Sequence, residues 1–167
     1  MVGGALTRTG LDPTRLTLEL TESTLIDDAA LAGVLLRRLR ALGLNLALDD
    51  FGTGYSSLTY IRAFPIGILK IDKSFVRSIG TERDDAAIVA AILALAKNLH
   101  MSVVAEGVET SEQRAILREL GCPFMQGYLF SRPRPIADAV GMIEDMADVA
   151  SGPDPVRALA GQPVHLR

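Results

Sequence analysis

The feature that most constrains this chain is a regular alternation of short apolar strands with helical patterns. Strands are predicted at residues 16–21, 44–49, 66–72, 101–105 and 124–125. Strands that alternate with helices are typical of parallel β–α units, in which each helix returns the chain to the start of the next strand. The chain is therefore expected to be an α/β protein.

A polar or charged residue is predicted at the C-terminal end of each strand, namely Glu19, Asp49, Lys70, Glu106 and Gln126. In (β/α)₈ barrels the strand ends converge on one mouth and carry the catalytic groups. A doubly wound sheet commonly binds its ligand through a Gly-rich phosphate loop, and no G-x-G-x-x-G stands between a strand and a helix here. We therefore predict a TIM-type (β/α) barrel whose five polar side chains lie within about 10–12 Å of one another.

The second predicted strand runs into two adjacent carboxylates, Asp49 and Asp50, followed by Gly52 and Gly54. Neighbouring carboxylates repel unless a cation or a proton lies between them, and hard oxygen ligands suit Mg²⁺ or Mn²⁺. Strand alternation predicts that Asp50 leaves on the side opposite to Asp49. The other interpretation is that the aspartates cap the next helix and the glycines form a turn. These residues alone leave both interpretations open.

Composition narrows the class of protein. A chain of 167 residues can form one domain with a core, and a net charge of −3 gives no reason to expect a nucleic acid polymer as partner. The single cysteine, Cys122, fits a reducing compartment. The apolar window at residues 86–99 is too short to span a bilayer, and the N-terminus has no signal-peptide pattern. We expect a cytoplasmic protein without a membrane segment.

Apolar stripes and caps predict several helices. One helix is expected to bury Leu31, Leu35, Leu39 and Leu42, and a later one Ile88, Ile92, Leu95 and Leu99. Thr110 and Gln113 match a capping box. Residues 1–150 are expected to form the domain, and residues 151–167 a flexible tail.

Five motifs follow one another in a specific order: L-E-L-T-E-S from residue 18, D-D-F-G-T-G from 49, L-K-I-D from 69, A-E-G-V-E from 105 and Q-G-Y-L-F-S-R-P from 126. This set closely resembles the EAL domain, a bacterial phosphodiesterase that cleaves cyclic di-GMP to linear pGpG. The resemblance covers residues 10–140, approximately. It implies metal-dependent hydrolysis of cyclic di-GMP in bacterial second-messenger signalling.

The resemblance also implies residue roles. The metal ligands would be Glu19, Asp49, Asp50 and Glu106, holding Mg²⁺ or Mn²⁺, with two ions expected. The catalytic residues would be Glu106, Lys70 and Gln126. Glu22 would support the loop after Asp50. The residues matching the guanine contact are Phe130, Arg132 and Pro133. For Asp72 and Glu109, capping or loop hydrogen bonds are as plausible as a direct role.

The sequence also departs from the family pattern. No Glu-Ala-Leu occurs, and the nearest sequence, Arg118-Glu119-Leu120, falls in a predicted helix. An asparagine ligand that precedes the Glu19 strand in the family is missing too. The chain is therefore expected to hold about five of the eight strands of an incomplete barrel, the C-terminal portion of an EAL domain.

Three interpretations follow from this departure. The chain is a truncated phosphodiesterase domain that is inactive alone, a non-catalytic remnant that binds cyclic di-GMP or a protein, or a fragment that folds poorly. The expected partners are cyclic di-GMP, an upstream sensor or GGDEF-type domain, and a second copy of the chain. Self-association is expected through the open strand edge at residues 16–20 or through residues 57–63.

Overall fold

The computed structural model of the chain describes residues 2–21, 29–53, 58–80 and 83–149. These residues contain one sheet whose strands are all parallel and lie in the order β1-β2-β3-β4-β5. The strands are β1 (Thr17–Thr21), β2 (Asn45–Phe51), β3 (Ile68–Ile71), β4 (Ser102–Ala105) and β5 (Phe124–Met125). The five strands expected from the sequence are therefore confirmed.

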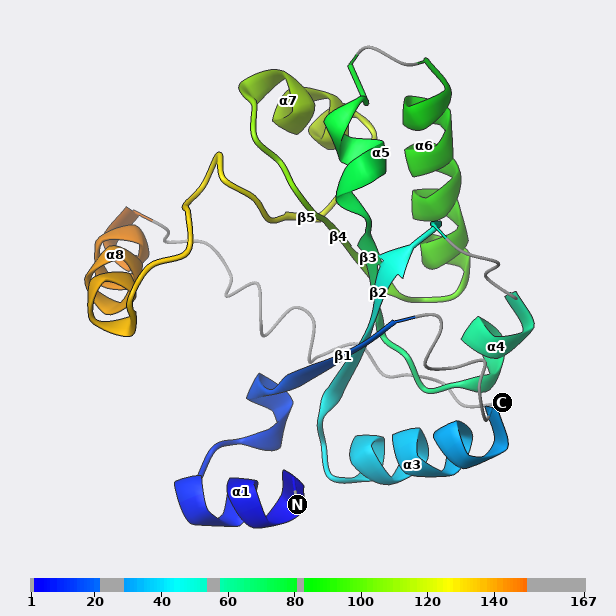
Figure 1. The fold of residues 1–167 in the computed structure, drawn as a ribbon, viewed down its shortest axis with the longest axis vertical. Helices are drawn as coiled ribbons and strands as arrows, with labels where there is room; N and C mark the ends of the chain where they lie inside the picture. The colour runs from blue at the N-terminus through cyan, green and yellow to red at the C-terminus, as the bar shows by residue number, and fades with distance from the viewer. Residues whose placement is uncertain (1, 22–28, 54–57, 81–82, 150–167) are drawn as a thin grey trace.

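Helices connect the strands in the order expected for a barrel. The described helices are α1 (Val2–Thr9), the short 3₁₀ helix η1 (Pro13–Arg15), α3 (Ala29–Ala41), α4 (Leu58–Ala63), α5 (Lys73–Arg77), α6 (Arg83–Asn98), α7 (Ser111–Glu119) and α8 (Ile136–Val149). Each strand lies beside the one that precedes it in the chain, with α5, α6 and α7 along one part of the sheet and α8 set apart from it (Figure 1). This is the sequential winding of a (β/α) barrel, here with five strands.

The core lies along the two central strands. Leu46 and Leu48 of β2, and Leu69 and Ile71 of β3, are each at most 1% exposed. Long apolar runs of this kind are expected where a parallel strand is covered on both faces. They pack in one cluster with buried residues from α5, α6 and α7, so the sheet is firmly held where β2 and β3 end.

Helix α7 begins at the predicted capping box. The Gln113 N–H donates to the Thr110 hydroxyl, and the Gln113 side chain accepts from the Thr110 N–H. The same side-chain oxygen accepts from the Glu109 N–H at 2.7 Å. These bonds satisfy backbone donors that the first helical turn leaves free, and they fix the loop that leads from β4 into α7.

The predicted stripe of α3 was wrong for three of its four leucines, whereas Leu39 packs against the core as expected. Leu31, Leu35 and Leu42 are 55%, 48% and 47% exposed, whereas Leu36 is buried. Gly33 is buried as well, and a Cβ placed on it would lie 3.2 Å from the Phe64 ring. Because a Cβ at this position would crowd the Phe64 ring, glycine lets the helix lie close to it, with Gly33 and Leu36 inward and the other three leucines exposed.

In α6 the predicted stripe is confirmed in part, because Ile92 is buried and Leu95 and Leu99 pack half-buried against the core. Ile88 is 38% exposed, however, and Val89 and Ala96 are buried instead. Spacing of three and four residues fits either set, so the sheet decides which face turns inward.

Two sequence expectations concern other parts of the chain. Residues 151–167, the predicted tail, lie outside the described residues. Among the described helices, none combines the length and the apolar character that a bilayer crossing requires.

Candidate active site

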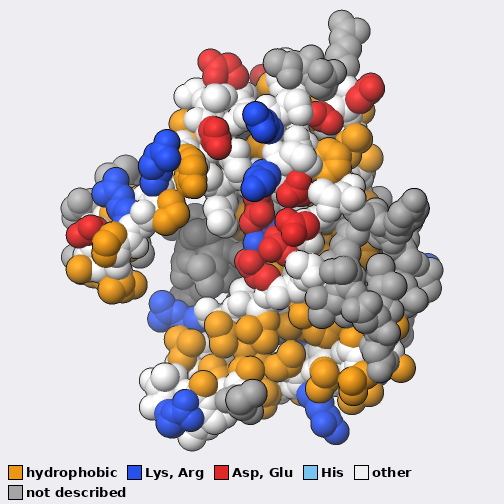
Figure 2. Space-filling view, viewed as in Figure 1, with side chains coloured by type: hydrophobic (Ala, Val, Ile, Leu, Met, Phe, Trp, Pro, Cys, Tyr) orange, Lys and Arg blue, Asp and Glu red, His pale blue; other side chains and the backbone are white. Residues whose placement is uncertain are grey.

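Acidic side chains gather near the middle of one face, over the carboxyl ends of the strands (Figure 2). Asp49 lies near the end of β2, Lys70 is the third of four residues in β3, and Glu106 directly follows β4. Glu19 is the third of five residues in β1, so it lies deeper than the strand end expected from the sequence. The structure nevertheless brings these four side chains together.

Lys70 is the centre of the cluster. Its Nζ atom donates to Glu19 Oε2 at 2.7 Å, to Glu106 Oε1 at 2.7 Å and to Asp49 Oδ1 at 3.0 Å. The lysine side chain is only 8% exposed. Burial alone would lower the pKa of Lys70, but hydrogen bonds to the three carboxylates outweigh it and raise the pKa above its ordinary value. Lys70 therefore stays a cation at the floor of the site.

A bulge in β2 brings Asp49 and Asp50 to the same place. Leu48 pairs with Leu69 and Phe51 with Ile71, so β2 has one residue more than β3 between these pairs. Asp50 adopts a φ of 54°, and its N–H donates to Asp49 Oδ1. A bulge re-aims the side chains of a strand. The prediction that the two aspartates point to opposite sides was therefore wrong.

One carboxylate oxygen from each of Asp49, Asp50 and Glu106 lies within 4.8 Å of the others. Burial, followed by the adjacent carboxylates of Asp49 and Asp72, raises the pKa of Asp50. Oxygen donors that repel one another in this way suit a hard divalent cation such as Mg²⁺ or Mn²⁺. The donor set therefore fits a metal. Glu19 lies outside this group of three oxygens, so its role as a ligand stays a prediction.

Asp72 caps α5, as one of the two interpretations of the sequence expected. The Ser74 N–H donates to Asp72 Oδ1 at 2.9 Å. Burial opposes ionisation of Asp72, but the hydrogen bonds from Ser74 hold its pKa below the ordinary value. Asp72 also interacts with Asp50, and strand alternation alone did not reveal this proximity.

The loops that follow β4 and β5 are joined through their backbones. The Gln126 N–H donates to the Ala105 carbonyl at 2.8 Å, and the Gln126 carbonyl accepts from the Val108 N–H at 3.0 Å. Gly127 makes this possible, because a Cβ there would overlap the backbone of Val108. Glu106 and Gln126 therefore begin neighbouring loops at the same edge of the sheet, while the catalytic role of Gln126 stays a prediction.

The segment after β5 presents an aromatic and cationic surface. Tyr128 and Phe130 are 51% and 42% exposed, and the Arg132 guanidinium lies 4.6 Å from the centroid of the Tyr128 ring. Pro133 is exposed beside them. Sequence reasoning singled out Phe130, Arg132 and Pro133 but missed Tyr128, whose position one residue after the strand-end glycine was the available signal. Exposed rings of this kind can stack on nucleobases.

Two further residues expected from the sequence are Glu22 and Glu109. Glu22, the predicted support of the Asp50 loop, lies outside the described residues. The backbone of Glu109 belongs to the capping interaction of α7.

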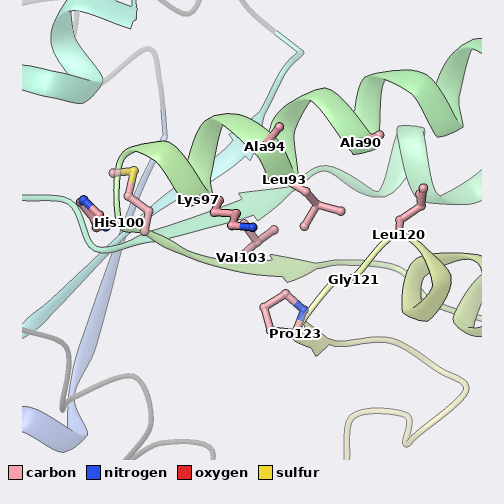
Figure 3. Close-up of a pocket in the computed structure, with 10 residues that line it drawn as sticks. Ala90, Leu93, Ala94, Lys97, His100, Val103, Leu120, Gly121 and Pro123 are labelled. Carbon is pink, nitrogen blue, oxygen red and sulfur yellow. The ribbon is translucent and has the colours of Figure 1, made fainter.

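A separate pocket of about 580 Å³ lies away from the carboxylates, between α6 and the chain segments that precede β4 and β5 (Figure 3). Leu93, Val103 and Pro123 form part of its lining, and in this view His100 lies at one end and Leu120 at the other. His100 and Pro123 come before their strands, whereas Glu106 and Gln126 come after them. Barrel enzymes carry their catalytic groups at the carboxyl ends of strands, so this pocket is not the candidate active site.

The fold and the cluster together define part of a TIM-like α/β barrel with a carboxylate-rich site at the carboxyl ends of its strands. The chain belongs to the EAL domain family, which matches residues 2–133. The family that the sequence motifs resemble is thereby confirmed, as is the incomplete barrel.

Known relatives agree with this assignment. The chain is 49% identical over 134 residues to the bifunctional diguanylate cyclase/cyclic di-GMP phosphodiesterase MucR of Pseudomonas aeruginosa. The aligned region covers 80% of this chain and 20% of MucR. It is similar to the solved MucR phosphodiesterase in complex with c-di-GMP, with a TM-score of 0.79 and 48% identity, covering 83% of this chain and 56% of that one.

A manganese and cy-diGMP complex of Klebsiella pneumoniae BlrP1 matches with a TM-score of 0.74 and 39% identity, covering 79% of this chain and 34% of that one. Compared with the full MucR sequence, the chain spans about a fifth of its relative's length.

Proposed function

We propose that this chain carries the C-terminal part of the active site of a metal-dependent cyclic di-GMP phosphodiesterase. The supporting observation is the convergence of Asp49, Asp50 and Glu106 beside the buried ammonium group of Lys70. The solved MucR and BlrP1 relatives are complexes with cyclic di-GMP. Cyclic di-GMP is accordingly the proposed substrate, and linear pGpG the proposed product.

Asp49, Asp50 and Glu106 are the proposed ligands of Mg²⁺ or Mn²⁺, with Glu19 as a fourth ligand and two ions in the complete site. The BlrP1 complex contains manganese, which supports a divalent ion. When bound, such a cation polarises a phosphodiester and lowers the pKa of the attacking water.

The residues of the chain would orient the reactants. Lys70 holds Glu19, Asp49 and Glu106 in fixed directions and offsets their negative charge, so that an anionic phosphodiester can approach. Glu106 and Gln126 would direct the water oxygen to the phosphorus atom, and the bond from phosphorus to the ribose 3′ oxygen would break.

Neighbouring segments would hold the substrate and the loop. Phe130, Arg132 and Pro133 would contact a guanine, with Tyr128 supporting the arginine. Glu22 would hold the loop after Asp50.

The remaining proposals concern the setting of the site. Residues 1–150 would form the domain portion and residues 151–167 a tail. The bifunctional name of MucR supports a partner domain of the GGDEF type, with or without a sensor, and self-association is a further proposal. The single cysteine supports a cytoplasmic location.

Because the chain alone is expected to be inactive, its function is tested in a complete domain, made by joining it to the N-terminal part of a related EAL domain. Hydrolysis of cyclic di-GMP with Mn²⁺, followed by chromatography of pGpG, is the assay. Asp49→Asn keeps the shape of the side chain but removes a charged ligand, so the rate should fall at least about 100-fold while the fold is retained. Glu119→Gln removes one charge from the exposed end of α7 and should leave the rate unchanged.

Two other results would change the conclusion. If the complete domain binds cyclic di-GMP by calorimetry without any turnover, this chain belongs to a non-catalytic binding remnant. Neither binding nor turnover, in a folded complete domain, would refute the proposed function of this chain.

A further inference from the structure

Helix α5 contacts both turns that carry the clustered carboxylates. Gly52 follows Asp50 by two residues and has a φ of 99°, and a Cβ placed on it would lie 2.9 Å from Cε2 of Phe75. Gly107 follows Glu106 and has a φ of 69°, and a Cβ placed there would lie 2.6 Å from the Cβ atom of Lys73. One short helix therefore packs directly against the backbone of both turns.

Helix α5 is itself held firmly. Asp72 accepts a hydrogen bond from the Ser74 N–H at its first turn, and Val76 is completely buried in the core. The Phe75 side chain packs against the core cluster from its edge. Ile92 of α6 approaches the same point, 3.7 Å from a Cβ placed on Gly52. The Phe75 ring thus lies against a rigid support on one side and the turn on the other.

We propose that Phe75 is a positioning residue whose ring fixes how closely the backbone of the turn at residues 50–53 approaches α5. In this way it sets the separation between the Asp49–Asp50 pair and Glu106. The inference rests on the proposed function, because it assumes that these carboxylates hold a metal. The turn contains a strand bulge and positive φ values at Asp50 and Gly52, and the recorded pairing with β3 ends at Phe51. Contacts beyond the strand ladder, such as the one with Phe75, therefore also set its position.

The spacing of the carboxylates matters because a cation must contact all three. Their oxygens lie within 4.8 Å of one another, and metal sites lose affinity when the groups that orient their ligands are removed. A smaller side chain at position 75 would let the turn move into the space that the ring leaves and so change its distance from Glu106. Lys73 would still support Gly107 on the other side.

Titration calorimetry with Mn²⁺ on the purified chain tests this role without relying on catalysis. Phe75→Leu should weaken Mn²⁺ binding about tenfold or more. Val76→Ala is the matched control, because it shortens the neighbouring, fully buried side chain on the same helix. It should lower the urea midpoint of unfolding while changing Mn²⁺ affinity less than twofold.

Equal Mn²⁺ affinity for the wild type and Phe75→Leu would overturn the inference and leave the proposed function standing. Equal weakening by both variants would also overturn it, since general packing of α5 would then explain the effect. If the folded wild-type chain binds no Mn²⁺, the proposed metal site and this inference both fail. Should Phe75→Leu not fold, Phe75→Met fills most of the same volume and should weaken binding in the same direction.

Discussion

Replacing Lys70 with methionine tests whether one buried cation holds the site together. Methionine fills a similar volume but cannot neutralise the carboxylates of Glu19, Asp49 and Glu106, which all lie within 3.0 Å of the Lys70 Nζ atom. Without divalent cations, these carboxylates would repel one another across a poorly solvated space. The variant should therefore be less stable than the wild type at pH 7.

The expected loss of unfolding free energy depends on how exposed the three carboxylates bound by Lys70 are. Removing one member of a buried ion pair costs about 3–5 kcal/mol. The Glu19 side chain is 49% exposed, so its interaction is screened and adds little, whereas Asp49 and Glu106 are 23% and 19% exposed. We therefore expect the low end of the range, about 3 kcal/mol of unfolding free energy.

Urea unfolding at several pH values, with a chelator present, measures this loss. The pKa of Lys70 is raised on folding, so its stabilisation is complete below the unfolded-state pKa of about 10.4 and is lost only as pH rises through the folded-state pKa. The deficit of Lys70→Met should therefore stay constant between pH 6 and pH 9, where Lys70 is fully charged in the wild type.

The exposed lysine Lys97 provides the control, and Lys97→Met should change stability by less than about 0.5 kcal/mol. The reasoning is refuted if Lys70→Met is as stable as the wild type at pH 7. It is also refuted if the deficit falls as the pH rises from 6 to 9, because Lys70 would then be losing its proton well below the raised pKa.

Three further predictions follow from other contacts. Gly127→Ala would place a Cβ on the backbone of Val108 and should lower the unfolding free energy by about 1–3 kcal/mol in urea; an unchanged midpoint would contradict the close approach. Thr110→Ala removes the cap of α7 and should cost about 1 kcal/mol by thermal unfolding, more than the same change at an exposed mid-helix position. Burial raises the pKa of the Cys122 thiol, so a disulfide reagent at pH 8 should modify it at least about tenfold more slowly than in urea, and a fast native reaction would argue against its burial.

Local signals in the sequence determined most of the secondary structure. The five strands were visible as short apolar segments separated by helical patterns, and Thr110 and Gln113 marked the start of α7 because a capping box needs only residues three apart. The adjacent carboxylates of Asp49 and Asp50 made a metal site one of two interpretations before any fold was known, and the motif resemblance added Glu106 as an implied ligand. Information of this kind is carried by neighbours along the chain.

Tertiary structure decided how these elements meet. The inward face of α3 depends on Phe64 packing against Gly33, which apolar spacing cannot reveal. Asp50 joins Asp49 because β2 is bulged relative to β3, and a bulge depends on the register of two strands. The sequence placed Lys70 among the polar residues at the strand ends, but it could not show that Lys70 binds carboxylates from β1, β2 and the end of β4. Only the sheet brings those charges within hydrogen-bonding distance, because their separation in space is set by strand pairing and not by their separation along the chain.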